Sequence, residues 1–182
     1  MSAPRSTRFP AMPRELVTPR LRLRAQRLDD AAAMRGLWLE RDPRSMRLVD
    51  PDGHPTVEEM RERVAAQLDE STRTGLSLLA IERHGSSGFL GYCGLIVGEA
   101  SPSEPEIAFE IYREFHGHGY ATEAAEAVLD AARATGRSTV WATVREWNVP
   151  SFALLERLGF TDSGRRSIDA ERGDSIWMTV DL

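Results

Sequence analysis

Stretches in which hydrophobic and polar residues alternate, or in which short hydrophobic runs are bounded by turn residues, indicate the strands of this chain. The stretch LRLRAQRL, which starts at Leu21, alternates most regularly. Two later stretches are joined by the short turn HGSSG and therefore predict a hairpin. In all, the pattern predicts strands over residues 21–28, 76–83, 89–98, 106–112, 139–144, 160–168 and 174–182.

Two helices are predicted between the first and second of these strands. An alanine-rich run over residues 29–40 begins with Asp29 and Asp30, either of which can act as its N-cap. The second helix begins with a capping-box pair, Thr56 and Glu59. Its apolar stripe has helical spacing and comprises Val57, Met60, Val64 and Leu68. The segment between the two helices, residues 41–55, is rich in proline, glycine and aspartate and predicts a loop.

Two further helices are predicted in the second half of the chain. The alanine-rich run Tyr120–Ala134 predicts the third helix, and Gly136 ends it. Residues 149–159 predict the fourth, with Pro150 in its first turn and Gly159 at its C-terminal end. The resulting order, β-α-α-β-β-β-α-β-α-β-β, predicts one mixed α/β domain without linkers.

Length and composition fit a single globular domain. The chain has 182 residues, of which 41% are hydrophobic and 28% are charged, and this is enough to build a core without covalent staples. We expect residues 1–14, with three prolines and three arginines, to be a flexible N-terminal tail, and residues 15–182 to form the domain. The net charge of -5 gives no reason to expect nucleic-acid or membrane binding. No apolar run approaches the length of a membrane span.

The cysteine and basic-residue content bears on the cellular compartment and on the kind of phosphate site that the chain can build. A single cysteine, Cys93, cannot form an internal disulfide, which is consistent with a cytoplasmic protein. Arg5 and Arg8 are not followed by an apolar segment, so we expect no signal peptide. All 23 basic residues are arginine. The absence of lysine matters for any phosphate site, because lysine is a common partner of phosphate.

The stretch HGHGYATEA places Gly117 and Gly119 between a predicted strand and a predicted helix. The first amides of a helix have no acceptors within the helix, and the helix dipole favours negative charge there. The glycines leave room for a phosphate near those amides, and Ala121 keeps a third position small. The turn lacks the length and Lys-Ser/Thr of a P-loop and the third glycine of a dinucleotide motif. Taken alone, it also fits a simple joint between strand and helix.

Three motifs in a fixed order carry a family resemblance: LVTPRLRLR, EIAFEIYREFHGHGYATEA and NVPSFALLERLGF. Together they resemble the GNAT superfamily of acetyl-CoA-dependent N-acetyltransferases. Within it the chain looks most like the group that acetylates ribosomal-protein N-termini, the RimJ and RimL type. The similarity extends from about Leu16 to Leu182. It implies an α/β (α+β) GNAT fold, in which flanking helices surround a mixed central sheet splayed between its fourth and fifth strands.

The resemblance also implies acetyl-CoA as co-substrate and gives particular residues a role in binding it. The turn from His116 to Ala121 would hold the pyrophosphate, although His116 stands where the family has Gln or Arg. The end of the preceding strand would bind the pantetheine arm through its backbone, and Asn148 would contact the cofactor from the mouth of the gap. The implied cofactor-binding residues are Glu110, Ile111, Tyr112, His116, Gly117, His118, Gly119, Tyr120, Ala121, Asn148 and Ser151.

Two carboxylates are candidates for the base. Transfer of an acetyl group to an amine requires a group that takes the amine's proton and a donor for the developing oxyanion. Glu106, which matches the glutamate of the family's EIGY-like stretch, is the first candidate catalytic residue. Glu110 is the second, because side chains repeat every two residues along a strand and so place it on the same face. Both residues also fit ordinary charges on a solvated strand face.

Ser151 is the candidate that would hydrogen-bond the leaving sulfur. Many GNAT enzymes have a tyrosine on this helix, but the matching position here is Leu155. The ribosomal-type group instead has a serine three residues after the asparagine, as Ser151 is after Asn148. In the structural alternative, Asn148 is an N-cap and Ser151 is a polar residue of the first turn.

The leading hypothesis is therefore acetylation of a primary amine, either a protein N-terminus or a small molecule, by direct attack in a ternary complex with acetyl-CoA. The alternatives are a non-catalytic module that senses acyl-CoA and a nucleotide-binding domain of another kind. The four histidines show no metal-ligand spacing, so we expect no metal. We expect no nucleic-acid or membrane partner, and the family resemblance suggests a homodimer.

Overall fold

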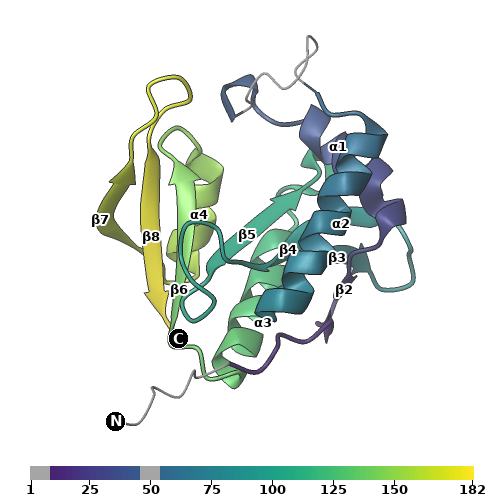
Figure 1. The fold of residues 1–182 in the computed structure, drawn as a ribbon, viewed down its shortest axis with the longest axis horizontal. Coiled ribbons are helices and arrows are strands. Elements are labelled where there is room, and N and C mark those ends of the chain that lie inside the picture. Colours follow the sequence, from purple (N-terminus) through teal and green to yellow (C-terminus); the bar gives the residue numbers. More distant parts are fainter. Residues whose placement is uncertain (1–8, 46–53) are drawn as a thin grey trace.

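The computed structural model describes residues 9–45 and 54–182 (Figure 1). Eight strands of this part of the chain form one sheet in the order β1-β2-β3-β4-β5-β6-β8-β7. The strands are β1 (Glu15–Val17), β2 (Leu21–Ala25), β3 (Leu78–Arg83), β4 (Phe89–Ile96), β5 (Glu106–Ile111), β6 (Thr139–Arg145), β7 (Thr161–Ser167) and β8 (Ser175–Asp181). The helices are α1 (Ala31–Leu39), α2 (Val57–Thr74), α3 (Tyr120–Ala134) and α4 (Val149–Arg157), with short 3-10 turns η1 (Leu28–Asp30), η2 (Pro43–Ser45) and η3 (Arg113–Phe115).

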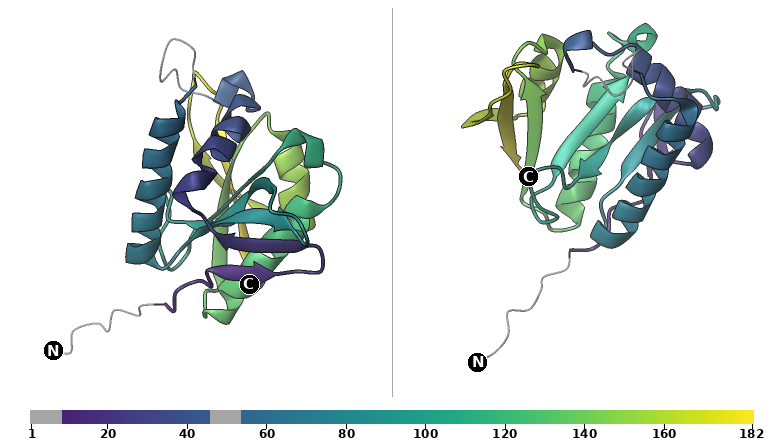
Figure 2. Two further views of the ribbon diagram at one scale, coloured as in Figure 1. Left: turned by 90° about the vertical axis from the view of Figure 1, so that its right-hand side faces the viewer. Right: turned by 45° about the horizontal axis from the view of Figure 1, so that its top comes forward.

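Helices lie on both faces of the sheet (Figures 1 and 2). Helices α1 and α2 pack against each other over one face, and α1 contacts β4 there. Helix α3 covers the opposite face, where it contacts β2, β4 and β5, and α4 lies on the same side behind β6. The face of α3 that meets the sheet is built mostly from small side chains, which allow a close approach: Ala124, Ala125, Val128, Leu129, Ala131 and Ala132 are buried.

The sheet opens between β5 and β6. These strands are parallel and pair only at Glu106↔Trp141, whereas β4 and β5 pair along the whole of β5. Beyond that single pair the strands diverge, and the half with β6, β8 and β7 turns away from the rest (Figure 1). Counted from the strand at Leu21, β5 and β6 are the fourth and fifth strands, so the predicted splayed GNAT fold is confirmed.

The N-terminal part of the chain packs more tightly than its composition predicts. The prediction missed β1, which has only three residues and pairs with β2 through Glu15↔Arg24. Such a short strand cannot show alternation. Before it, Met12 is buried and its N–H donates to the Gly75 carbonyl at 2.8 Å. Within the predicted tail over residues 1–14, Met12 is therefore anchored in the core between exposed neighbours, and residues 1–8 lie outside the described part.

The two helices over the α1–α2 face begin as the sequence predicts. The capping box of α2 is present, because the Glu59 N–H donates to Thr56 Oγ1 and the Thr56 N–H donates to Glu59 Oε2. Asp30 is the N-cap residue of α1, but its carboxylate makes no capping bond. It accepts two hydrogen bonds from the buried Arg24 guanidinium, at 2.7 and 2.8 Å, and so fixes the start of α1 to β2. Of the predicted loop between these helices, residues 46–53 lie outside the described part.

Candidate active site

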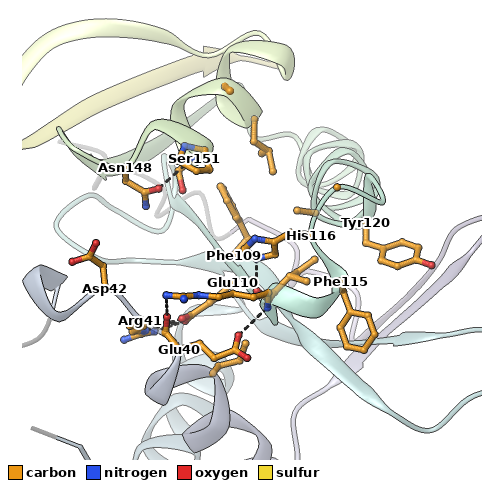
Figure 3. A pocket seen from close by; sticks show the side chains of 18 of the residues that line it. Glu40, Arg41, Asp42, Phe109, Glu110, Phe115, His116, Tyr120, Asn148 and Ser151 are labelled. Carbon is orange, nitrogen blue, oxygen red and sulfur yellow. Dashed lines mark hydrogen bonds and ion pairs between the residues drawn. The ribbon is translucent and has the colours of Figure 1, made fainter.

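A cleft of about 910 Å³ opens where β5 and β6 diverge. Its lining comes from the end of α1, the end of β5, the start of α3 and the start of α4. Figure 3 shows Asn148 and Ser151 of α4 on one side, Glu40, Arg41 and Asp42 on the other, and Glu110 and His116 between them. The divergence of the strands thus gathers residues that are distant in the sequence.

One wall of the cleft is formed by the glycine turn and the first turn of α3. We call it the glycine wall, and it comprises Gly117, Gly119, Tyr120, Ala121 and Thr122, all of which line the cleft. Gly117 and Gly119 both have a φ of +75°, in the left-handed region that favours glycine. Gly119 is the N-cap residue of α3, so the chain turns sharply there, and the residues that carry the first, unpaired amides of the helix line the cleft. This is the geometry that an anion such as a pyrophosphate requires.

The two histidines of the turn make local contacts. His116 lines the cleft, and its Nε2 lies 2.7 Å from the Ile111 carbonyl. Because a carbonyl only accepts hydrogen bonds, Nε2 carries the proton and fastens the turn to the end of β5. His118 does not line the cleft; its ring stacks on that of Tyr120, with centroids 5.5 Å apart. A role for His118 in cofactor binding stays a prediction.

The backbone of β5 provides the floor of the cleft. The Trp141 N–H donates to the Pro105 carbonyl, which shows that the odd-numbered residues of β5 direct their backbone groups toward β6. The backbone groups of Phe109 and Ile111 also point toward the β6 side. Because β6 has diverged at these positions, they have no partner strand there. The Tyr112 N–H turns the other way and donates to the Leu90 carbonyl. The groups available to a bound molecule are therefore the N–H and carbonyl of Phe109 and the N–H of Ile111, because the Ile111 carbonyl already accepts from His116.

The start of α4 forms the opposite rim. Asn148 and Ser151 both line the cleft, and the Ser151 N–H donates to Asn148 Oδ1 at 3.4 Å. Asn148 is the N-cap residue of α4, which agrees with the structural alternative. It also lines the cleft, which its predicted role in cofactor binding requires. Further along the helix, Arg157 also lines the cleft, and its Nη1 lies 3.4 Å from Thr122 Oγ1 of the glycine wall. A cation therefore stands beside the start of α3.

The wall opposite α4 is charged. We call it the ionic wall, and it comprises Arg41, Tyr92 and Glu110. Arg41 donates from both Nε and Nη2 to the Glu110 carboxylate, at 2.8 and 2.5 Å, and the Tyr92 hydroxyl donates to the same carboxylate at 3.0 Å. Burial, followed by the Glu110 charge, raises the pKa of Tyr92 well above its ordinary value, so its hydroxyl stays a donor. Burial opposes ionisation of Arg41, but Glu110 raises the pKa of the guanidinium above its usual value.

Glu106 occupies a different environment from Glu110. Its side chain lies on the same face of β5 but does not line the cleft, and the residue is only 5% exposed. Its carboxylate accepts from the Glu99 N–H at 2.7 Å and from Thr143 Oγ1 of β6 at 3.0 Å. Glu106 therefore joins β5 to β6 at the base of the opening. Of the two candidate bases, only Glu110 reaches the cleft in this structure.

A cation–aromatic contact crosses the mouth of the cleft. The Arg44 guanidinium, on η2, lies 4.4 Å from the centroid of the Trp147 ring, which follows β6. The Trp147 Nε1–H donates to the Arg172 carbonyl at 2.8 Å, and this bond fixes the ring from behind. The Asp42 carboxylate binds Arg44, whose hydrogen bond lowers the Asp42 pKa to about 2.

Of the residues in the ionic wall and in this crossing contact, the sequence prediction gave a catalytic or cofactor-binding role to Glu110 alone. Arg41 and Glu110 are 69 positions apart, and no local pattern links them. Tyr92 and Glu110 are direct partners in the β4–β5 register, so pairing the predicted strands residue by residue would have brought these two together. Within residues 9–45 and 54–182, no cluster of three or more His, Cys, Asp or Glu side chains has the geometry of a metal site. None of the described helices has the length and apolar character needed to cross a membrane.

Sequence comparisons identify relatives along most of the chain. A family model described as an acetyltransferase (GNAT) domain matches residues 20–161. The uncharacterized N-acetyltransferase p20 of Bacillus licheniformis is 26% identical over 150 residues, which cover 82% of this chain and 83% of the relative. The uncharacterized protein YkkB of Bacillus subtilis is 32% identical over 149 residues, which cover 80% of this chain and 84% of YkkB.

Solved structures share the fold. An acetyltransferase from Agrobacterium tumefaciens has a TM-score of 0.73 at 25% identity, covering 98% of this chain and 99% of that chain. YncA from Salmonella typhimurium, solved with its cofactor acetyl-CoA, has a TM-score of 0.66 at 19% identity, covering 89% and 94%. RimJ from Mycobacterium smegmatis, in complex with CoA-disulfide, has a TM-score of 0.69 at 23% identity, covering 89% and 82%. At these two lower identities the likeness concerns the fold.

Proposed function

The chain belongs to the GNAT acetyltransferase family, and from that premise we propose that it transfers the acetyl group of acetyl-CoA to a primary amine of a protein N-terminus or a small molecule. The observation that carries the proposal is that the glycine wall and Glu110 line one cleft. The first can hold the phosphates of the cofactor, and the second can receive a cationic amine. The resemblance to the RimJ and RimL type favours protein N-termini among the acceptors, and the likeness in fold to Mycobacterium RimJ is consistent with it.

In this proposal acetyl-CoA lies along the opening between β5 and β6. The pyrophosphate binds to the amides of the glycine wall, next to Arg157. The pantetheine arm hydrogen-bonds to the backbone of β5 at Phe109 and Ile111, which have no partner strand. The family resemblance implied the segment from Glu110 to Tyr112 for this contact. The β4–β5 register supports Ile111 within that segment and favours Phe109 over Tyr112.

The proposed reaction is a direct transfer. The neutral amine nitrogen attacks the thioester carbonyl carbon, the C–N bond forms, and the oxyanion is stabilised by a backbone N–H of β5 that faces the cleft. The C–S bond then breaks and releases the CoA thiolate. Glu110 attracts the ammonium and accepts the amine's proton, directly or through a water, while Ser151 hydrogen-bonds to the departing sulfur. Glu106, the first candidate from the sequence, becomes the alternative base in this proposal because it does not line the cleft.

The alternative, a module that binds acyl-CoA without turnover, has one observation in its favour. Both oxygens of Glu110 accept hydrogen bonds from Arg41, so the candidate base is occupied in this structure. Mass spectrometry of a mixed panel of amines and short peptides, incubated with acetyl-CoA and the protein, separates the two functions. We expect an acetylated product whose formation depends on the protein. Binding of acetyl-CoA by calorimetry with no product from any amine would support the sensor and overturn the enzyme.

A further inference from the structure

A second cavity, of about 360 Å³, lies beside the active-site cleft on the α1–α2 side of the sheet. Its lining includes Arg41, Tyr92 and Glu110, so the cavity and the cleft meet at the ionic wall, whose residues line both. The volume is within the range of small-ligand sites. A molecule in this cavity would therefore reach Glu110, which also lines the cleft.

Most of the wall of this cavity is apolar. Met34 comes from α1, Met60 and Val64 come from α2, and Leu78 begins β3. Unbranched methionine side chains adapt to irregular shapes. The cavity therefore suits an aliphatic chain.

Two buried polar groups in the lining lack the partners that such groups normally have. Gln26 is 4% exposed, and the only hydrogen-bond partner of its side-chain amide within the described residues is the sulfur of Met34, at 3.8 Å. The Nε1–H of Trp38 is buried, and it too has no partner in the described part of the chain. Buried polar groups are satisfied in the great majority of cases, and an unmatched one costs stability. Together they leave an amide and an indole donor unmatched in residues that line the cavity.

The charges around the cavity compensate one another. Arg41 is neutralised by Glu110 in the ionic wall, and its guanidinium lies 4.1 Å from the centroid of the Trp38 ring. Arg63 lies 4.7 Å from the same centroid and, with Glu70, contributes one charge of each sign to the lining. The charged residues of the lining, Arg41, Arg63, Glu70 and Glu110, sum to zero net charge, so the cavity offers an ionised tail no net attraction to offset the loss of its water. A neutral tail that both donates and accepts hydrogen bonds fits better.

We propose that this second cavity binds the tail of the acceptor, and that the preferred tail is an aliphatic chain ending in a neutral carboxamide. The carbonyl of that group would accept from Trp38 Nε1–H, and its NH₂ would donate to the carbonyl of the Gln26 side chain. The amine would lie at Glu110, on the boundary between cavity and cleft. This inference rests on the proposed N-acetyltransferase function and deepens it by naming the class of acceptor. The carboxamide tail can belong to a small free amine or to the first side chain of a peptide.

The test compares isosteric acceptors. Initial rates with acetyl-CoA are measured for three amines that share a five-methylene chain: 6-aminohexanamide, the apolar isostere 6-methylheptylamine, and the charged 6-aminohexanoate. Shorter ω-amino amides cover other chain lengths. The peptides Gln-Ala-Ala-Ala and Leu-Ala-Ala-Ala form the second arm of the test. This arm distinguishes a peptide acceptor from a small free amine. We expect the amide to exceed both alternatives in kcat/KM by at least roughly tenfold in one arm, because sites built for hydrogen bonding reject analogues that lack the group.

Two variants test the residues. Trp38→Phe removes only the indole N–H and keeps an aromatic ring beside Arg41, and Gln26→Leu removes the amide at similar size. Each should lower the ratio of kcat/KM for the amide to kcat/KM for the apolar isostere about tenfold, through KM. Trp141→Phe removes an indole N–H that binds Glu104 outside both cavities, and should not change this ratio. Thermal melting checks that each variant is folded. If one variant fails to fold, the other still tests the proposal.

Calorimetry distinguishes failure of this inference from failure of the proposed function. The amide is titrated into the CoA-saturated protein, in which no turnover can occur. Binding that weakens in Trp38→Phe and Gln26→Leu, but not in Trp141→Phe, supports the cavity even if no acetylation is detected. Equal rates and equal binding for amide and isostere, or the same preference in both variants, would overturn it while leaving the acetyltransferase function intact.

Discussion

The two walls of the active-site cleft differ in what they are made of. The glycine wall is a continuous segment that offers mainly backbone groups, shaped by two glycines with positive φ. The ionic wall brings together side chains from the end of α1, from β4 and from β5, and hydrogen bonds to one carboxylate hold them in place. A backbone site tolerates side-chain exchange as long as the chain keeps its conformation. A side-chain site changes as soon as one member is replaced.

The walls are also joined to each other. The Arg113 N–H, at the start of η3, donates to the Glu40 carboxylate at 2.8 Å, and the Tyr112 hydroxyl donates to the Ala33 carbonyl at 2.6 Å. Both contacts tie α1 and its C-cap to the segment that leads into the glycine turn. Gly36 allows this approach, because a Cβ there would lie 2.1 Å from the Tyr112 hydroxyl. The position of Arg41 therefore depends on the segment that shapes the glycine wall.

The largest effect should come from the ionic wall. Glu110→Gln keeps the size of the side chain and removes its charge and its ability to take a proton. A positioned base contributes roughly 10²–10⁴-fold, so kcat should fall at least about a hundredfold while the Kd of acetyl-CoA changes little. Steady-state kinetics and calorimetry measure the two quantities.

Glu106→Gln is the matched variant on the same strand face. The glutamine side chain would keep a bond to Thr143 but leave the Glu99 N–H with a poorer acceptor, so the free energy of unfolding should fall by roughly 1–3 kcal/mol. The rate should stay within about threefold of wild type. The opposite pattern, with kcat lost in Glu106→Gln and kept in Glu110→Gln, would make Glu106 the base and Glu110 a partner of Arg41.

The next largest effect should come from the backbone of the glycine wall. Gly119→Ala introduces a side chain at a φ of +75°, and the left-handed conformation costs an L-residue roughly 1–2 kcal/mol. Relief of that strain would move the first amides of α3, so we expect the Kd of acetyl-CoA to rise about tenfold. Gly136→Ala imposes the same strain at the other end of α3, where φ is +83° and no neighbouring atom lies within 4 Å. It should lower the melting temperature similarly and leave the Kd alone; equal Kd values in the two variants would exclude the amide site.

The sequence anticipated one wall much better than the other. A strand, two glycines and a helix start are contiguous, so their geometry follows from local rules. The predicted turn from His116 to Ala121 contains four of the five residues of the glycine wall. Arg41 meets Glu110 only because α1 packs over this face of the sheet, and nothing in either local sequence encodes that distance. The prediction of two carboxylates on one strand face was geometrically sound. What separates Glu106 from Glu110 is the divergence of β6, which buries one and leaves the other in the cleft.

A smaller effect should come from the one cation that α4 places beside the glycine wall. Arg157 lines the cleft next to Thr122, whereas Arg133, on α3, pairs with Asp130 outside it. Arg157→Ala should raise the Kd of acetyl-CoA roughly threefold to fivefold, because an exposed charge contact contributes up to about 1 kcal/mol. The difference should shrink at high salt. Arg133→Ala is the control; a Kd that rises equally in both variants would assign the effect to net charge.

The smallest effect should come from His116, the side chain of the turn that most directly tests whether the glycine wall works through its backbone. Its Nε2–H holds the Ile111 carbonyl, and a glutamine amide can donate the same bond. His116→Gln should therefore keep the Kd of acetyl-CoA within about twofold, whereas His116→Ala should raise it about threefold by releasing the turn, since one hydrogen bond contributes about 1 kcal/mol. Calorimetry of both variants decides between two roles of the ring. If His116→Gln weakens binding as much as His116→Ala does, the imidazole itself contacts the phosphates. The glycine wall would then depend on a side chain as the ionic wall does, and the contrast between the walls would disappear.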